Sequence, residues 1–115
     1  MMTLAQARRA RLAAAMAARG IDAMVLYGNA WQGDYLRYAA DFGILEGHGV
    51  AIVSSDGTTE LHLDSATEAE RAEAEVLGAV VCFDPDISGA VAARLVLLRN
   101  RHVAAAPRRF LPSAL

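Results

Sequence analysis

Short apolar runs recur along the chain and alternate with segments rich in helix formers. Three of the runs are continuous enough to predict strands that are buried on both faces, at residues 22–27, 49–54 and 79–83. A weaker apolar run at 101–105 predicts a further strand. Strands of this kind, separated by helices, are typical of an α/β domain with helices on both faces of its sheet.

The segment at 58–63 differs from these runs because its apolar and polar residues alternate. One side of the predicted strand carries Thr59, Leu61 and Leu63. The other side carries only polar residues, namely Thr58, Glu60, His62 and Asp64. We therefore predict an edge strand with one face in water. The S-D-G turn at 55–57 is too short for a crossover, so this strand and the one before it form a hairpin.

Four segments are predicted to be helical. The first begins at a capping box formed by Thr3 and Gln6 and ends at Gly20, with its arginines in solvent. The second spans 34–40. The third begins at a capping box of Ser65 and Glu68 and runs to about residue 77, with a solvated acidic face. The fourth begins at D-P-D, with Pro85 in its first turn, and runs to about residue 98.

The order of these elements predicts one domain over residues 1–115. Its core is a mixed five-stranded sheet, built from a hairpin followed by βαβ crossovers, in which one strand is antiparallel to the others. The last residues, L-P-S-A-L at 111–115, look like the opening of another helix. We therefore expect the chain to be a fragment of a longer protein.

Charge and composition exclude several classes of function. A net charge of −2 and a pI of about 5.8 argue against a nucleic-acid binder. All 11 basic residues are arginine, which excludes a Schiff-base lysine, a P-loop and a kinase, so D-F-G at 41–43 is no kinase signature. The single cysteine, Cys82, excludes a disulfide framework, and no apolar run is long enough for a membrane span. We expect a cytoplasmic protein.

Candidate polar chemistry lies just before the strand at 49–54. Asp41, Glu46 and His48 stand there among three glycines. They could form a pocket wall that binds an amine or a carboxylate, with His48 able to change charge near neutral pH. Alternatively, the stretch is a turn in solvent whose glycines adopt positive φ angles.

Other residues also allow two interpretations. The aromatic residues could line a groove or a subunit contact, or they could belong to the core: Trp31, Tyr35, Tyr38 and Phe42. The setting of Trp31 among small and polar residues favours exposure. Three polar residues of the alternating strand could ligate a metal or simply face water: Glu60, His62 and Asp64. For Cys82 we predict a buried apolar role.

Four stretches carry a resemblance to a known family. The first is R-R-A-R-L-A-A-A-M-A-A-R-G-I-D-A-M-V-L-Y-G at 8–28, and the second is Y-A-A-D-F at 38–42. A strand with the S-D-G hairpin and the acidic helix E-A-E-R-A-E follow, and R-R-F-L-P-S-A-L comes last at 108–115. In this order they resemble the N-terminal domain of the creatinase/prolidase/Xaa-Pro aminopeptidase family, the pita-bread metallopeptidases.

The resemblance implies a fold and a division of labour. The implied fold is the ribonuclease-H-like fold of creatinase N-terminal domains. The implied role is that of a non-catalytic domain in a Xaa-Pro aminopeptidase or dipeptidase, where it would shape the substrate entrance and the dimer. Catalysis would belong to a C-terminal pita-bread domain, expected after residue 115, with Mn, Co or Zn as the divalent metal. The metal-binding motifs of that domain do not occur in this chain. The resemblance therefore assigns no catalytic residue and no metal ligand here.

The resemblance also suggests where a site and its partners would lie. It places a substrate-pocket wall at Asp41, Phe42, Glu46 and His48. An interface or groove is expected at Trp31, Tyr35 and Tyr38. The implied partners are the protein's own catalytic domain, a second copy in a homodimer, and a small peptide or amidino substrate; we expect neither nucleic acid nor membrane.

Two alternatives stay open. The parent protein could be a metal-free amidinohydrolase of creatinase type, or the chain could be a stand-alone α/β binding or dimerisation module. Creatinases carry a Phe and an Arg after Y-x-x-D-F, and the corresponding stretch G-I-L-E-G-H-G lacks that pair. Creatine specificity is therefore disfavoured.

Overall fold

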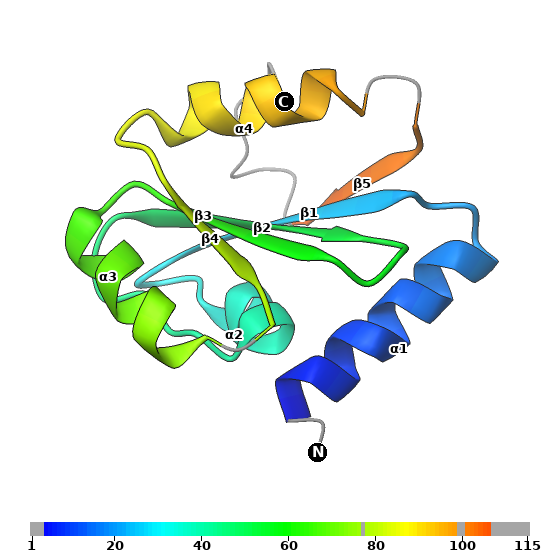
Figure 1. The fold of residues 1–115 in the computed structure, drawn as a ribbon, viewed down its shortest axis with the longest axis horizontal. Helices are drawn as coiled ribbons and strands as arrows, with labels where there is room; N and C mark the ends of the chain where they lie inside the picture. Colours follow the sequence, from blue (N-terminus) through cyan, green and yellow to red (C-terminus); the bar gives the residue numbers. More distant parts are fainter. Residues whose placement is uncertain (1–3, 77, 99–100, 107–115) are drawn as a thin grey trace.

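The computed structural model describes residues 4–76, 78–98 and 101–106. Its elements in chain order are α1 (Leu4–Ala18), β1 (Ala23–Asn29), α2 (Asp34–Ala40), β2 (His48–Ser54), β3 (Thr59–Leu63), α3 (Ala66–Glu75), β4 (Val80–Phe83), α4 (Ile87–Val96) and β5 (Val103–Ala106) (Figure 1). The capping box predicted at Thr3 and the helix opening predicted at 111–115 lie outside the described residues. None of the described helices has the length and apolar character needed to cross a membrane.

The five strands form one mixed sheet in the order β4-β3-β2-β1-β5. β2 is antiparallel to both of its neighbours, β1 and β3. β4 is parallel to β3, and β5 is parallel to β1. β2 is thus the one strand that runs against the others, which confirms the predicted sheet.

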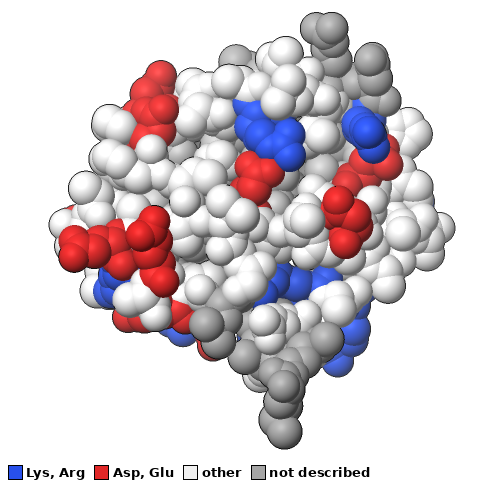
Figure 2. All heavy atoms as spheres, in the orientation of Figure 1, with Lys and Arg blue, Asp and Glu red and all other residues white. Residues whose placement is uncertain are grey.

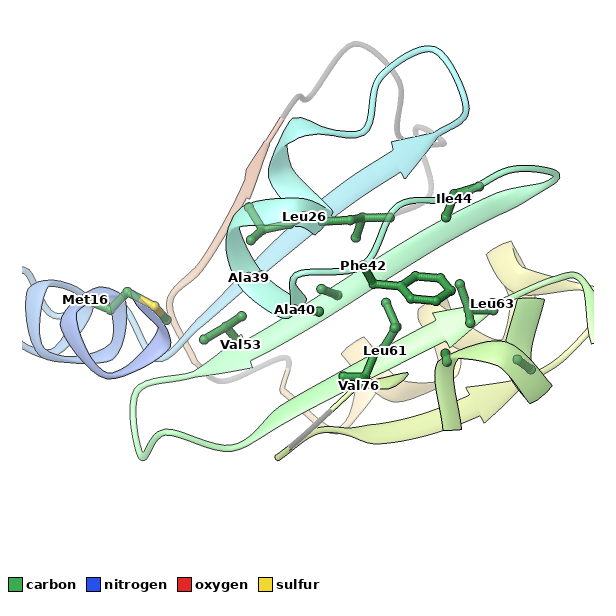
Figure 3. Close-up of a cluster of buried hydrophobic side chains, with 14 residues drawn as sticks. Met16, Leu26, Ala39, Ala40, Phe42, Ile44, Val53, Leu61, Leu63 and Val76 are labelled. Carbon is green, nitrogen blue, oxygen red and sulfur yellow. The ribbon is translucent and has the colours of Figure 1, made fainter. Parts of the chain in front are cut away.

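The sheet has helices on both faces, which explains the continuous apolar runs. α1, α2 and α3 lie on one face and α4 on the other (Figure 1). The larger cluster of buried side chains includes Met16, Leu26 and Leu61 on the first face (Figure 3). The smaller cluster includes Val25 and Ile52, which pack near α4. Successive side chains of β1 therefore belong to clusters on opposite faces of the sheet, as expected for a strand buried on both faces.

The prediction of an edge strand at 58–63 is wrong. β3 lies between β2 and β4, because α3 carries the chain to a parallel position outside it. The polar face of β3 is covered rather than wet: His62 is only 7% exposed, and Glu60 accepts a hydrogen bond from the Nε atom of Arg94 in α4 at 2.7 Å. The Glu60–Arg94 ion pair thus covers the face of β3 that the alternating pattern predicted to be in water.

The turn at Gly20 ends α1 as predicted, but Arg9 of this helix is buried although it was predicted to be in solvent. Gly20 has φ +71°, and the backbone amide of Ile21 donates to Met16 while that of Gly20 donates to Ala17, which is the Schellman arrangement. Arg9 was predicted to be solvated and is instead 3% exposed. Its Nη1 atom donates to the Ala39 carbonyl at 2.8 Å and so joins α1 to the end of α2.

The two later helices begin at side-chain caps. The Ser65 hydroxyl accepts from the Glu68 amide at 3.3 Å, as the capping box predicts. Asp86 caps α4 by accepting from the Gly89 amide at 3.1 Å. Pro85 therefore precedes the cap, whereas the sequence had predicted it to lie in the first turn of the helix. The helix begins at Ile87, slightly later than predicted, and a difference of this size is common at helix ends.

Candidate ligand cleft

An open cleft of about 520 Å³ lies at one end of the sheet. Its lining includes Asn29, Trp31, Arg37, Asp41, Arg71 and Glu75. Asn29 is the last residue of β1, and the rest of the wall comes from the loop at 30–33, α2 with its C-cap Asp41, the Gly43–Leu45 loop and α3. The cleft thus lies beyond the carboxyl end of a strand, where open α/β sheets commonly bind ligands.

One wall of the cleft is formed by an exposed ion pair at the end of α2. Arg37 Nη1 and Asp41 Oδ1 are 3.5 Å apart, and both side chains are more than half exposed. Asp41 is the C-cap of α2 and has a left-handed backbone, with φ +53°. A side chain at Gly43 would meet the Arg37 guanidinium, which would have to move aside. An exposed pair of this length is weak, and both groups remain available to a ligand.

A second part of the wall is organised by Arg71 of α3. Its Nη2 atom donates to Glu68 at 2.7 Å and to the Gly43 carbonyl at 2.6 Å, and its Nη1 atom donates to Glu75 at 3.2 Å. The guanidinium also lies 4.3 Å from the centroid of the Phe42 ring. Arg71 therefore ties the loop after α2 to α3.

Glu68 is the buried acid of this network, although the sequence predicted a solvated acidic face on α3. The residue is 2% exposed, and its carboxylate accepts from the Leu45 amide at 2.8 Å. Burial opposes its charge, but the hydrogen bonds from Arg71 and Leu45 outweigh that effect and lower the pKa of Glu68. Hydrogen bonding to Glu68 raises the pKa of Arg71 in turn. The remaining acids of α3 stay outside, and Figure 2 shows acidic side chains gathered over this helix.

The polar candidates Glu46 and His48 lie at the same end of the sheet but are not part of the cleft lining. Asp64 accepts from the His48 amide at 2.7 Å and contacts its Nδ1 atom at 2.8 Å. An ionised carboxylate only accepts, so Nδ1 of the neutral ring carries the proton and Nε2 is an acceptor. Glu46 accepts from the Ser65 hydroxyl at 2.7 Å.

The aromatic candidates occupy three different environments. Trp31 is 91% exposed at the rim of the cleft, where the Asn29 side chain accepts from its backbone amide at 2.9 Å. Tyr35 and Tyr38 line a separate apolar groove of about 420 Å³ between α1 and α2. Phe42 is completely buried in the larger cluster (Figure 3). Its chain neighbours Asp41 and Gly43 and its contact Arg71 line the cleft, but the ring itself does not, so its predicted place on a pocket wall stays a prediction.

The two arginines of the cleft, Arg37 and Arg71, were not predicted from the sequence. Arg71 did carry a signal, because it is the lone basic residue in an acidic helix. Nothing in the sequence pattern singles out Arg37.

The potential metal ligands in the described ranges do not gather in the cleft. Two acids of the cleft wall, Asp41 and Glu75, are paired with arginine instead. One group of three ligand types does converge, and it consists of Glu60, His62 and Cys82 on the α4 side of the sheet. Cys82 was predicted to be buried and is half-buried on β4; burial, followed by Glu60, raises the pKa of its thiol.

The fold and the cleft define an α/β domain with a ligand-sized hollow at one end of a mixed sheet. The sequence profile of the creatinase/prolidase N-terminal domain family matches residues 8–108. The chain belongs to that family. Among curated proteins, none matches the sequence significantly.

Solved structures share this fold at low sequence identity. A Xaa-Pro dipeptidase from Bacillus anthracis is 22% identical with a TM-score of 0.72, over 96% of this chain and 29% of that one. The N-terminal creatinase/prolidase-like domain of a Corynebacterium diphtheriae protein is 17% identical with a TM-score of 0.64, over 91% of this chain and 96% of that one. A dipeptidase from Pyrococcus horikoshii OT3 is 14% identical with a TM-score of 0.63, over 92% and 29%.

Two of these neighbours are much longer than this chain. The chain spans 29% of the length of the Bacillus dipeptidase and the same share of the Pyrococcus enzyme. Its fold is therefore found as one part of longer peptidase chains.

Proposed function

We propose that the chain is the non-catalytic N-terminal domain of a Xaa-Pro aminopeptidase or dipeptidase, and that it shapes the substrate entrance. The observation that carries this proposal is the cleft at the end of the sheet, with exposed groups of both charges in a domain of the creatinase/prolidase family. The catalytic domain would follow residue 115.

The cleft suits a small zwitterion such as a Xaa-Pro dipeptide. Arg37 offers a planar guanidinium to a carboxylate, and Asp41 offers a carboxylate to an ammonium group. Because their mutual bond is long and exposed, a ligand can replace it at little cost. Arg71 is different, since its donors are already engaged by Glu68, Glu75 and Gly43. It acts as a support for the wall.

His48 and Glu46 extend the proposed wall beyond the cleft lining. Asp64 orients the His48 ring, so Nε2 can accept a hydrogen bond from a substrate amine. Glu46 is held by Ser65 and places negative charge at the same end of the sheet. Phe42 acts from behind, because it supports the guanidinium of Arg71.

The metal that the family implies does not fit the cleft, because Asp41 and Glu75 are paired with arginine and the described carboxylates of the lining do not converge. We therefore assign Mn, Co or Zn to the proposed catalytic domain, where it would activate the attacking water. No step of that chemistry is assigned to a residue of this chain.

A homodimer in the cytoplasm completes the proposal. Trp31 is almost fully exposed, and Tyr35 and Tyr38 border an apolar groove. Exposed aromatic side chains are enriched at protein interfaces. We place the contact with a second copy on these residues.

The purified 115-residue chain is expected to show no turnover of Xaa-Pro dipeptides, with or without Mn²⁺, Co²⁺ or Zn²⁺. The reason is that the proposed hydrolytic centre lies in another domain. The measurement is release of free proline, with the full-length protein assayed in parallel to verify the conditions. Robust metal-dependent turnover by the short chain would overturn the non-catalytic assignment, and turnover of creatine instead of dipeptides by the full-length protein would favour the amidinohydrolase alternative.

A further inference from the structure

Three different metal-ligating side chains meet on the α4 side of the sheet. Glu60 and His62 come from β3, and Cys82 comes from β4. The parallel register pairs His62 directly with Cys82, and Glu60 precedes His62 by one strand repeat on the same face. The ligand atoms of the three residues all lie within 4.8 Å of one another.

We propose that Glu60, His62 and Cys82 bind a divalent transition metal of the zinc type, with a fourth position open to water. Thiolate, imidazole and carboxylate are the three ligand types that zinc accepts in proteins. Mg²⁺ and Ca²⁺ prefer oxygen ligands alone and are therefore disfavoured. On binding, the thiol proton passes to solvent, and the His62 ring takes the tautomer with its proton on Nδ1, so that Nε2 is free. Sulfur–metal and nitrogen–metal bonds then form.

The spacing of the ligand atoms suits this ion. His62 Nε2 and Glu60 Oε1 are 3.0 Å apart. A tetrahedral zinc with bonds of about 2.0–2.1 Å to nitrogen and oxygen keeps such ligands roughly 3.3–3.5 Å apart. The metal can therefore replace this hydrogen bond after a shift of a few tenths of an ångström, and the thiol needs to approach by about 1 Å.

The surroundings hold two of the ligands in place. His62 is more than nine-tenths buried, so its ring is confined beneath α4. Arg94 Nε donates to the second carboxylate oxygen of Glu60 at 2.7 Å, which leaves the first oxygen directed at His62. Outer hydrogen bonds of this kind orient metal-binding carboxylates in known sites. Cys82 lies on the outermost strand and is half-buried, so an ion can reach the thiol from solvent.

The structure also alters the ligand set that the sequence suggested. The strand pattern grouped Asp64 with Glu60 and His62. Asp64 instead lies past the end of β3 and binds His48, and Cys82 takes the third position from the neighbouring strand. The proposed metal site is on the opposite face from the cleft, so it does not depend on the proposed function.

The test is a Co²⁺ titration of the reduced 115-residue chain, followed by displacement with Zn²⁺. We expect one equivalent of Co²⁺ to produce a thiolate-to-cobalt charge-transfer band and the d–d bands of a tetrahedral ion. Cys82→Ala should abolish the charge-transfer band, and His62→Gln should weaken binding by about tenfold or more. His48→Gln is the matched control, because it alters another histidine–carboxylate pair and should leave the titration unchanged.

A second readout uses only the unaltered chain and stays decisive if a variant fails to fold. Bound Zn²⁺ should slow alkylation of Cys82 by iodoacetamide, and a chelator should restore the rate. The proposal is overturned if Co²⁺ gives no thiolate band, or if Zn²⁺ leaves alkylation unchanged. It is also overturned if folded Cys82→Ala and His62→Gln bind as tightly as the control. Any of these results would mean that Glu60, His62 and Arg94 form a hydrogen-bonded network without a metal.

Discussion

Arg71→Met is expected to lower the free energy of unfolding by roughly 3–5 kcal/mol, because it leaves the buried carboxylate of Glu68 without its charged partner. Glu68 is 2% exposed and accepts two hydrogen bonds from Arg71. The same substitution removes the bond to the Gly43 carbonyl and the contact with the Phe42 ring. Urea unfolding at neutral pH measures the loss.

Arg37→Met is the matched control for this prediction. Arg37 also pairs with an acid one helical turn away, but that pair is exposed and 3.5 Å long, so its loss should cost about 0.5 kcal/mol or less. Adding Glu68→Gln to Arg71→Met should recover part of the stability, since a neutral amide oxygen can still accept from Leu45. Equal costs for Arg71→Met and Arg37→Met would contradict this account of the wall.

The pH dependence follows from the lowered pKa of Glu68. A depressed folded-state pKa contributes stability above the unfolded value of about 4.3, and this contribution is lost as the pH falls through the folded value. The unaltered chain should therefore lose stability on acidification below that range. Arg71→Met should lose less over the same interval, because its main stabilising interaction with the carboxylate is already gone.

Phe42→Ala is expected to cost about 3–5 kcal/mol of unfolding free energy, as large-to-small changes at fully buried aromatic residues do. The ring is 0% exposed and belongs to the larger cluster with Leu61, Leu63 and Val76 (Figure 3). Phe83→Ala on β4 provides the control, because that ring is 50% exposed and its removal should cost about 1 kcal/mol or less.

The comparison decides between two roles for Phe42. A cost well above that of Phe83→Ala assigns the ring to the core, from which it supports Arg71. A cost no greater than that of Phe83→Ala would mean that the ring is available to solvent and ligands. Combining Phe42→Ala with Arg71→Met should give a coupling energy of about 0.5–2 kcal/mol, because the guanidinium stacks on the ring.

The strands were predictable because a strand that is buried on both faces appears in the sequence as a continuous apolar run. β1 and β2 supply alternate residues to clusters on opposite sides, so their central positions, 23–26 and 50–53, are all apolar. The reversal at 55–57 was equally clear, since only a hairpin fits so short a connection. The mixed sheet with one antiparallel strand followed from the hairpin and the helical crossovers, and the structure identifies that strand as β2.

The polar face of β3 was misread for a physical reason. Alternation shows that one face is polar, but it does not distinguish water from a charged partner. Glu60 finds that partner in Arg94, which lies 34 residues further along the chain. No local pattern could reveal the pair.

The cleft was only partly predictable for a similar reason. Asp41 and Trp31 stood out because polar and aromatic residues in a glycine-rich loop are unusual, and both line the cleft. Arg71 joins the cleft through the Gly43 carbonyl, 28 residues away, and helix periodicity alone placed its acidic neighbours in solvent. Glu68 was thus misassigned, because burial of a charge requires a partner that only the folded chain supplies.

The most direct test of the proposed entrance is kcat/KM for a Xaa-Pro dipeptide with the full-length protein carrying Arg37→Gln. We predict a fall of roughly tenfold or more, mainly through KM, because one charge-assisted bond to the substrate carboxylate is lost. Arg11→Gln, at an exposed arginine of α1 outside the cleft, should stay within about twofold of the unaltered protein. An unchanged kcat/KM for Arg37→Gln would contradict the claim that this cleft meets the substrate.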